Sequence, residues 1–416
     1  MTHSGNEQNK SGVTQLDPAQ ANSHAHSGRG AAGKSYKERS FETKLIHFGA
    51  EIDPVTGASS VPIYQASTFH QEDILNPPQH DYSRSGNPTR QALEDYIALL
   101  EGGARGFAFA SGMAAISTAF LILSAGDHVI VTEDVYGGTY RFLTTVLNRM
   151  NIEISFVDMT NLEQVKGALR PNTRAVYMET PSNPTLKITD IGAVTKWAQD
   201  NHLLTMLDNT FMTPYYQRPI ELGVDIILHS ATKFLCGHSD VLAGLAVART
   251  PELGKQLKHL QNGLGTVLGP QDSWLLMRGM KTLGARMAHT EKSTAIIADW
   301  LNNRDDIHAL YYPGLSSHPG HAIQAAQSSG FGSVLSFDVG SGERAKQVLD
   351  RVQLPLVAVS LGAVESILSY PPTMSHAAMG ATVRAERGIT DGLLRLSVGL
   401  EDVNDLIADL EQALED

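Results

Sequence analysis

The sequence has a single cysteine, Cys236, among 416 residues. One cysteine excludes a disulfide within the chain and indicates a reducing compartment. An apolar run able to cross a bilayer is also missing, because the run over residues 114–125 is short and interrupted by Ser and Thr. The first forty residues lack the apolar core of a signal peptide. These absences predict a cytoplasmic protein that is not bound to a membrane.

Basic residues are outnumbered, with 32 Lys and Arg against 44 Asp and Glu and a formal net charge of -12. This balance argues against nucleic acid or an anionic membrane as the main partner. The net charge does not argue against a zwitterionic small molecule as the substrate. A hydrophobic fraction of 42% indicates a globular protein, and 416 residues exceed what one core usually fills. We therefore expect two or more domains.

Residues 1–40 are dominated by Ser, Gly, Asn, Gln and His. Such a composition cannot bury enough apolar surface to fold, so we predict a disordered tail. His24 and His26, with His3, could bind a metal adventitiously, but histidines in a flexible tail are usually solvated. We predict no metal site.

Residues 41–85 are predicted to form an arm that contacts a neighbouring subunit. The arm is extended, with turns at Asp53-Pro54 and at Asn76-Pro77-Pro78, and it has little apolar surface to bury by itself. A larger α/β domain over residues 86–285 and a smaller C-terminal α/β domain over residues 286–416 would follow.

Strands alternate with helical stretches in the larger predicted domain. This order predicts a mostly parallel sheet with helices on both faces, whose ligands bind at the carboxyl ends of strands. A long helix over 271–302, interrupted near 279–284, leads to the second domain, which contains a strand at 334–338. The other predicted strands are 106–109, 128–131, 153–157, 175–178, 203–207 and 226–228, and the helical stretches are 114–123, 140–149 and 191–200.

The segment Ser230-Ala231-Thr232-Lys233 follows a predicted buried strand. A lysine withdrawn from water has a lowered pKa and can form a Schiff base. The hydroxyls of Ser230 and Thr232 suit a phosphate group. The alternative is a solvated lysine in a loop.

Two upstream segments offer matching chemistry. Asp208 closes the apolar run 203–207, where a buried carboxylate could pair with the protonated ring nitrogen of pyridoxal phosphate (PLP) or cap the turn at Asn209-Thr210. Ser111-Gly112-Met113 begins an Ala-rich helix, whose first amides could bind a phosphate or only connect two elements.

Further motifs stand in order along the chain. They are YSRSGNPT (82–89), SGM (111–113), EDVYGGT (133–139), ETPSNP (179–184), DNT (208–210), HSATK (229–233), GHSD (237–240) and RLSVGLE (395–401). With these motifs the chain resembles, from about Thr43 to the C-terminus, the transsulfuration family of PLP-dependent enzymes of cysteine and methionine metabolism. The resemblance implies an aspartate aminotransferase-like fold (fold type I), with residues 86–285 as the PLP-binding domain.

The resemblance also implies a role for each matching residue. Lys233 would bind the cofactor and shuttle protons, and Tyr136 would stack on the cofactor ring. Asp208 would pair with the ring nitrogen, and Arg395 would bind the substrate carboxylate. Phosphate contacts would come from Ser230, Thr232, Gly112 and Met113, with Tyr82 and Arg84 from a neighbouring subunit, and substrate contacts from Asn183 and Ser360.

Plainer interpretations exist for several of these residues. Tyr136 could be a core aromatic residue, Arg395 part of a surface ion pair, and Asn183 a turn residue before Pro184. Cys236 lies three residues after Lys233, and we interpret it as a small buried filler rather than a catalytic thiol.

The resemblance implies a reaction of an amino-acid Schiff base. Cleavage of cystathionine at the β-carbon would give homocysteine, pyruvate and ammonia, and cleavage at the γ-carbon would give cysteine and 2-oxobutyrate. Gly138 stands where methionine γ-lyases typically carry cysteine, and Val359 where eukaryotic-type γ-lyases often carry glutamate. The stretch 364–376 is most similar to Gram-positive β-lyases, so we favour cystathionine β-elimination.

Cystathionine γ-lyase, γ-synthase or a bifunctional enzyme remain alternatives. A protein with this fold that only binds a partner and has lost catalysis would lack some of the catalytic residues. In this chain, every motif position holds a residue type able to perform its role. The resemblance further implies a homotetramer built from dimers with shared active sites.

Overall fold

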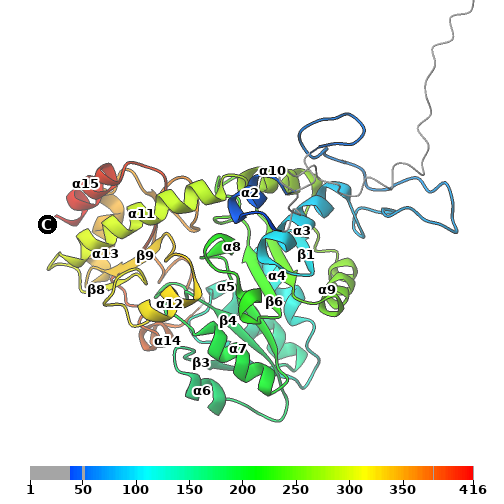
Figure 1. Ribbon diagram of the computed structural model, residues 1–416. Coiled ribbons are helices and arrows are strands. Elements are labelled where there is room, and N and C mark those ends of the chain that lie inside the picture. Colours follow the sequence, from blue (N-terminus) through cyan, green and yellow to red (C-terminus); the bar gives the residue numbers. More distant parts are fainter. Residues whose placement is uncertain (1–37, 49–51, 378, 416) are drawn as a thin grey trace, which may run out of the picture. The chain divides into compact units, whose positions relative to one another are not determined.

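The computed structural model describes residues 38–48, 52–377 and 379–415 (Figure 1). Our predictions for the tail, including those for His3, His24 and His26, fall mostly on residues 1–37, outside the described residues. Within the described ranges, no helix combines the length and the apolar character that a membrane span requires. The same ranges contain no group of three or more His, Cys, Asp or Glu side chains that could hold a metal ion.

Seven strands form the larger sheet, in the order β1-β7-β6-β5-β4-β2-β3. Strands β2 to β6 are parallel to one another, and β7 runs antiparallel between β1 and β6. This confirms the predicted α/β fold with a mostly parallel sheet. The strands are β1 (Arg105–Phe109), β2 (His128–Thr132), β3 (Glu153–Val157), β4 (Thr173–Glu179), β5 (Leu204–Asp208), β6 (Ile226–Ser230) and β7 (Gly244–Ala248).

Both faces of this sheet are buried. Along β4, Val176 and Met178 join one apolar cluster, whereas Ala175 and Tyr177 join another. Burial on both faces explains why the strands read as nearly continuous apolar runs. Helices α3 (Pro88–Glu101) and α7 (Ile191–Asp200) contribute to the first cluster, and α4 (Gly112–Phe120) and α9 (Pro251–Leu264) to the second.

A smaller sheet of five strands lies in the C-terminal part, in the order β10-β11-β12-β9-β8. Its apolar cluster includes buried residues of α11, α13 and α15. Both sheets belong to one compact unit, and the boundary at residues 285/286 stays a prediction. The elements are β8 (Ala309–Tyr311), β9 (Val334–Asp338), β10 (Leu356–Val357), β11 (Ile367–Ser369), β12 (Leu393–Ser397), α11 (Leu283–Asn302), α12 (His321–Gln327), α13 (Gly342–Arg351), α14 (Ala381–Glu386) and α15 (Val403–Leu414).

Several predicted elements match the structure closely. Strands β3 and β9 and helix α7 have the predicted bounds. The interrupted long helix is confirmed as α10 (Pro270–Met280) followed by α11. The predicted helix over 140–149 is wrong in its bounds: α5 (Gly137–Phe142) begins earlier and continues as a π-helix (Leu143–Leu147) and a short 3-10 helix (Asn148–Met150). The sequence analysis missed several elements, among them α3, β7 and α9.

The predicted arm is extended only in part. Its start forms the helix α2 (Phe41–Ile46), because Ser40 caps the helix and Leu45 is buried. From residue 52 to 86, the described backbone forms turns and an isolated bridge between Thr68 and Tyr82, but no helix or strand. Ile74 and Leu75 are 83% and 85% exposed.

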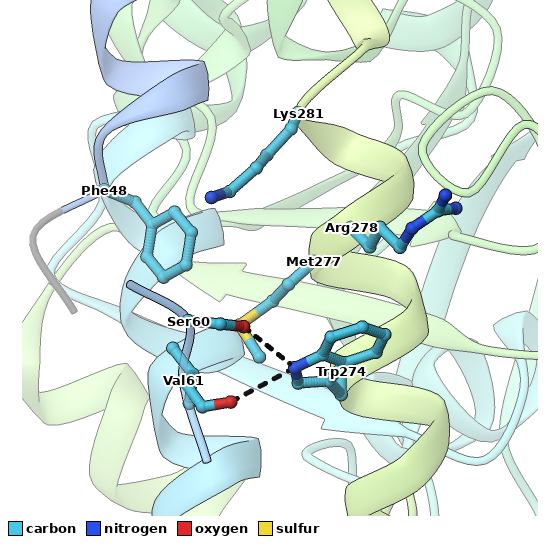
Figure 2. A pocket seen from close by; sticks show the side chains of 7 residues that line it. All are labelled: Phe48, Ser60, Val61, Trp274, Met277, Arg278 and Lys281. Atoms are coloured by element: carbon cyan, nitrogen blue, oxygen red, sulfur yellow. Dashed lines mark hydrogen bonds between the residues drawn. The ribbon is translucent and has the colours of Figure 1, made fainter. Parts of the chain in front are cut away.

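A shallow hollow of about 210 Å³ lies where the arm meets α10 (Figure 2). The indole nitrogen of Trp274 donates to the Val61 carbonyl at 3.1 Å and to Ser60 Oγ at 3.3 Å. The Lys281 ammonium lies 5.4 Å from the centre of the Phe48 ring. These contacts hold Phe48, Ser60 and Val61 of the arm against α10 and the residue that follows it. None of the predicted site residues lines the hollow.

Candidate active site

A cavity of about 490 Å³ opens at the carboxyl ends of the parallel strands. Residues at the ends of β4, β5 and β6 line it, together with segments from the C-terminal part of the chain. The structure brings ten of the twelve predicted site residues to this cavity: Gly112, Met113, Tyr136, Asn183, Asp208, Ser230, Thr232, Lys233, Ser360 and Arg395. The other two, Tyr82 and Arg84, do not line it.

Lys233 lies in the turn that follows β6, and it is not a solvated loop lysine. Its Nζ donates to Ser360 Oγ at 2.6 Å. Burial, together with the positive charge of Arg395, lowers the pKa of Lys233 to about 8. The neutral share of this amine near physiological pH is therefore larger than that of an ordinary lysine, and the neutral form is the one that nucleophilic and general-base chemistry requires.

The first turn of α4 packs tightly on the end of β6. A Cβ atom on Gly112 would lie 2.8 Å from the Ser230 Cβ, so this approach requires glycine. Ser111 caps α4 by accepting from the Ala114 amide at 3.1 Å. The remaining first-turn amides and the Ser230 hydroxyl thus surround a site suited to an anion. The Thr232 hydroxyl donates to the Ala243 carbonyl at 3.2 Å.

Asp208 ends β5 and is only 7% exposed. Its Oδ1 accepts from the Thr210 amide at 3.0 Å, so the turn-capping interpretation is correct for this oxygen. The same residue lines the cavity, where a carboxylate can also bind a cationic group. Burial raises the pKa of Asp208, and the hydrogen bonds from Thr210 oppose that rise.

Tyr136 is 40% exposed and lines the cavity, so it is not a core aromatic residue. Its amide donates to Glu179 Oε2 at 3.0 Å. A Cβ atom on Gly138 would lie 2.4 Å from the Tyr136 ring and 3.1 Å from Met113 Sδ. Gly138 therefore lets the chain pack closely against the Tyr136 ring, and the exposed part of this ring is available for stacking.

Arg395 lies in the middle of β12 and is 3% exposed, so the surface ion-pair interpretation is wrong. Its guanidinium donates to Asn183 Oδ1 at 2.8 Å, to the Ser360 carbonyl at 2.7 Å and to Ser369 Oγ at 3.1 Å. None of these acceptors is a carboxylate, and its Nε has no partner among the described residues. Burial lowers the pKa of Arg395 to about 10. A buried cation without a counter-ion favours an anionic ligand.

Ser360 joins the two buried cations. Its hydroxyl accepts from Lys233, and its carbonyl accepts from Arg395. Its φ of 103° lies in a region that non-glycine residues rarely adopt and that costs about 1–3 kcal/mol. Asn183 is 3% exposed and bonded to Arg395, which agrees with a site role rather than with a simple turn residue.

Comparisons with known proteins agree with this geometry. Residues 42–415 match the Cys/Met metabolism PLP-dependent enzyme family. This chain belongs to that family. It is 60% identical over 375 residues to cystathionine beta-lyase MetC of Bacillus subtilis, and the aligned region covers 90% of this chain and 96% of the relative. It is 53% identical over 374 residues to cystathionine gamma-lyase of the same organism, which covers 90% and 99%.

A solved structure, that of cystathionine gamma-lyase from Lactobacillus plantarum complexed with L-serine, superposes with a TM-score of 0.89. It is 50% identical and covers 90% of this chain and 98% of its own. The protein is thus a PLP-dependent enzyme of fold type I, which confirms the predicted fold and cofactor.

The cavity of this PLP-dependent enzyme fits the cofactor. A lysine with a pKa of about 8 suits the aldehyde, and the start of α4, whose close approach to Ser230 requires Gly112, suits the phosphate. The half-exposed Tyr136 ring suits the pyridine face, and the buried Asp208 suits the ring nitrogen. Each of these matches depends on the chemistry of the side chains and backbone amides that line the cavity.

Two charged residues that line the cavity were not assigned a role from the sequence. Glu179 ends β4, beside Asp208, and Arg141 lies on α5 beyond Tyr136. Glu179 was part of a quoted motif, and its place at a strand end could have marked it as a site residue. Arg141 follows the YGGT motif without a signal of its own, since an arginine on a short helix is usually solvated.

Tyr82 and Arg84 lie on the arm. Tyr82 is 48% exposed, and the Arg84 guanidinium lies 5.7 Å from its ring centre. Their contribution to the site of another subunit remains a prediction.

Cys236 is 1% exposed and does not line the cavity. Its thiol donates to Asp240 Oδ1 at 3.1 Å, and burial raises its pKa to about 11. A thiol in this state is a poor nucleophile, which agrees with the interpretation as a buried filler.

Proposed function

We propose that this enzyme cleaves cystathionine by β-elimination, giving homocysteine, pyruvate and ammonia. The observation that carries the proposal is a buried arginine without a carboxylate partner, Arg395, next to a lysine whose pKa is about 8. One group suits the carboxylate of an amino acid, and the other suits removal of its α-proton. The 60% identity to a cystathionine beta-lyase supports this substrate.

Arg395 would hold the substrate carboxylate through its planar fork of donors. Its contacts to Asn183, to Ser369 and to the Ser360 carbonyl orient the guanidinium before substrate arrives. Asn183 and Ser360 also line the cavity. Both are proposed to contact the substrate directly.

Lys233 would remove the α-proton once it is released from the cofactor, and it would then return a proton to the products. Its lowered pKa favours the neutral base. Ser360 Oγ, 2.6 Å from the amine, orients it toward the cavity.

Bound PLP supplies an electron sink that stabilises the charge left on the α-carbon. We propose that Asp208 pairs with its ring nitrogen, that Tyr136 stacks on its ring, and that six groups hold its phosphate. These groups are the amides of Gly112 and Met113, the hydroxyls of Ser230 and Thr232, and, from a neighbouring subunit, the side chains of Tyr82 and Arg84.

Two observations favour β- over γ-elimination. The chain is more similar to the B. subtilis β-lyase, at 60%, than to its γ-lyase, at 53%. Val359 lines the cavity beside Ser360, where it adds an apolar side chain and no carboxylate.

Product analysis tests the proposal. The purified enzyme, loaded with PLP and incubated with L,L-cystathionine, should form pyruvate and homocysteine in equal amounts. Cysteine and 2-oxobutyrate as the main products would identify a γ-lyase instead. No cleavage at all would favour a γ-synthase or a protein that only binds a partner.

Cystathionine γ-lyase is the second candidate, supported by the 53% identical relative and by the superposed solved structure. The same residues serve both eliminations, so one enzyme could form both product pairs. The ratio of pyruvate to 2-oxobutyrate measures the preference.

We further propose a cytoplasmic homotetramer built from dimers with shared active sites. The exposed arm from residue 52 to 86, with its exposed Ile74 and Leu75, supports burial against another subunit. Sedimentation analysis of the PLP-loaded enzyme tests the tetramer, and cell fractionation tests the location.

A further inference from the structure

Two buried carboxyl groups lie side by side at the edge of the sheet that faces the cavity. Glu179 of β4 pairs in register with Asp208 of β5, and the two strands are parallel. Residues in register on neighbouring strands are about 4.8 Å apart and direct their side chains to the same face. Glu179 and Asp208 are 6% and 7% exposed, and both line the cavity. When two shielded carboxyl groups lie close together, the charge of one disfavours ionisation of the other.

The surroundings decide which of the two keeps the proton. Asp208 accepts the Thr210 amide at 3.0 Å and lies within electrostatic range of His229 of β6, and both favour its ionised form. Glu179 accepts the Tyr136 amide at 3.0 Å, but Asp208 and Asp134 both oppose a negative charge on it, and the more distant Arg395 of β12 only partly offsets them.

The direction of each pKa shift agrees with this contrast. Burial and the charge of Asp208 raise the pKa of Glu179 well above its ordinary value. Burial also raises the pKa of Asp208, which its hydrogen bonds counteract. Tyr177 on β4 faces both carboxyl groups and stays neutral, because burial and these charges raise its own pKa.

We propose that Glu179 is a further positioning residue of the cofactor site: it holds Tyr136 and stays a neutral carboxylic acid, so that Asp208 alone presents a negative charge to the cofactor ring. This inference rests on the roles proposed above for Tyr136 and Asp208. A second ionised carboxylate in this place would compete with Asp208 for the cationic ring nitrogen. The neutral acid avoids that competition and still accepts the Tyr136 amide.

Infrared spectra of the cofactor-free, full-length protein with 13C-labelled glutamate carboxyl groups test the protonation state. At pH 8 the wild-type protein should show a protonated glutamate band that Glu179→Gln lacks. Asp208→Asn removes the neighbouring charge, so the same band should titrate at least one pH unit lower than in the wild type. A wild-type spectrum without this band, or a band that survives Glu179→Gln, overturns the proposal. If Glu179→Gln does not fold, the shift in Asp208→Asn decides.

Stability gives an independent measure. An acid whose pKa is raised by folding stabilises the fold below its ordinary pKa of about 4.5, and this stability is lost as pH rises toward the folded pKa. Glu179→Gln has no such loss, so its Tm relative to the wild type should rise from pH 5 to pH 8. The matched control, Glu365→Gln, changes an exposed glutamate and should show no such trend. A constant Tm difference for Glu179→Gln contradicts a buried neutral acid.

The positioning role is tested by PLP binding. Glutamine keeps an acceptor for the Tyr136 amide, so Glu179→Gln should bind PLP within about threefold of the wild type, whereas Glu179→Ala should bind at least about tenfold more weakly. Equal binding by both variants overturns this role. None of these measurements uses cystathionine turnover. An active enzyme with an ionised Glu179 overturns this inference alone, and an inactive one with a neutral Glu179 overturns the proposed function alone.

Discussion

At the scale of single residues, two basic side chains share one site and are both largely shielded from solvent. Lys233 has most of its surface buried, and the charge of Arg395 adds to the cost of protonating it. Ser360 links the two by accepting from both. The proposed reactivity of Lys233 is therefore a property of this pair rather than of the lysine alone.

The titration of Lys233 follows from this pair. In the cofactor-free protein, labelling of Lys233 by an amine-specific reagent should increase with pH around a midpoint of about 8. Arg395→Met removes a positive charge that disfavours protonation, so the midpoint should move to higher pH. Peptide mapping by mass spectrometry measures both midpoints. A midpoint that is unchanged in Arg395→Met would show that burial alone lowers the pKa.

Arg395→Lys tests the substrate carboxylate site. Lysine keeps the charge but lacks the planar fork that contacts Asn183, Ser360 and Ser369. We expect kcat/KM for cystathionine to fall by at least about tenfold, or ~1.4 kcal/mol, with unchanged PLP content. Arg218→Lys, at an exposed ion pair with Glu221, is the control. Wild-type kinetics for Arg395→Lys would reject the proposed carboxylate contact.

At the scale of elements, the site depends on how closely α4 approaches β6. The first turn of α4 touches Ser230 where β6 ends, and only a residue without a side chain fits there. The proposed phosphate-binding amides of α4 and the proposed phosphate-binding hydroxyl of Ser230 thus come from two elements, which one added carbon atom on Gly112 could separate. This is why a glycine begins the helix despite its low helix propensity.

Gly112→Ala should separate these elements. The new Cβ would lie 2.8 Å from the Ser230 Cβ, so one element must shift, and the affinity for PLP should fall by at least about tenfold. Gly167→Ala is the matched control, because its Cβ would meet no atom within 4 Å in helix α6 (Leu162–Gly167). It should bind PLP normally and gain up to about 1 kcal/mol of stability. Equal PLP affinity in both variants would mean that α4 does not bind the phosphate.

At the scale of the whole molecule, much of the arm is not buried by the rest of its own chain. Much of residues 52–86 is exposed, and Tyr82 and Arg84 lie outside the cavity that holds the other ten predicted residues. A shared site explains both observations, since the partner's cavity would receive these side chains.

Mixed oligomers test this arrangement. In a dimer of one Arg84→Ala chain and one Lys233→Ala chain, one site would inherit both changes and the other neither. Refolding the two weakened variants together should therefore restore activity, with up to about half of the hybrid's sites intact. Differently tagged chains verify that hybrids form. Hybrids without recovered activity would reject the proposed role of Arg84 in the site of a neighbouring subunit.

The sequence by itself determined most of the fold and of the site. Strands and helices whose apolar residues form long, regular runs, such as β3, α7 and β9, are set by local patterning and were predicted with their bounds. Short stretches of small residues, such as β7, carry no such signal, and α5 continues into a π-helix that periodicity does not predict. Most of the proposed site residues stand in the motifs quoted above, several of them at strand ends, so their types and order could be recognised without coordinates.

What only the tertiary structure decided is the state of those residues. The contact between Lys233 and Ser360 joins positions 127 residues apart, and the pairing of Glu179 with Asp208 depends on the register of two strands. Protonation responds to burial and to nearby charge, and both arise only when distant segments pack together. A motif can therefore name the lysine, the aspartate and the arginine, but the fold sets which of them carries a charge.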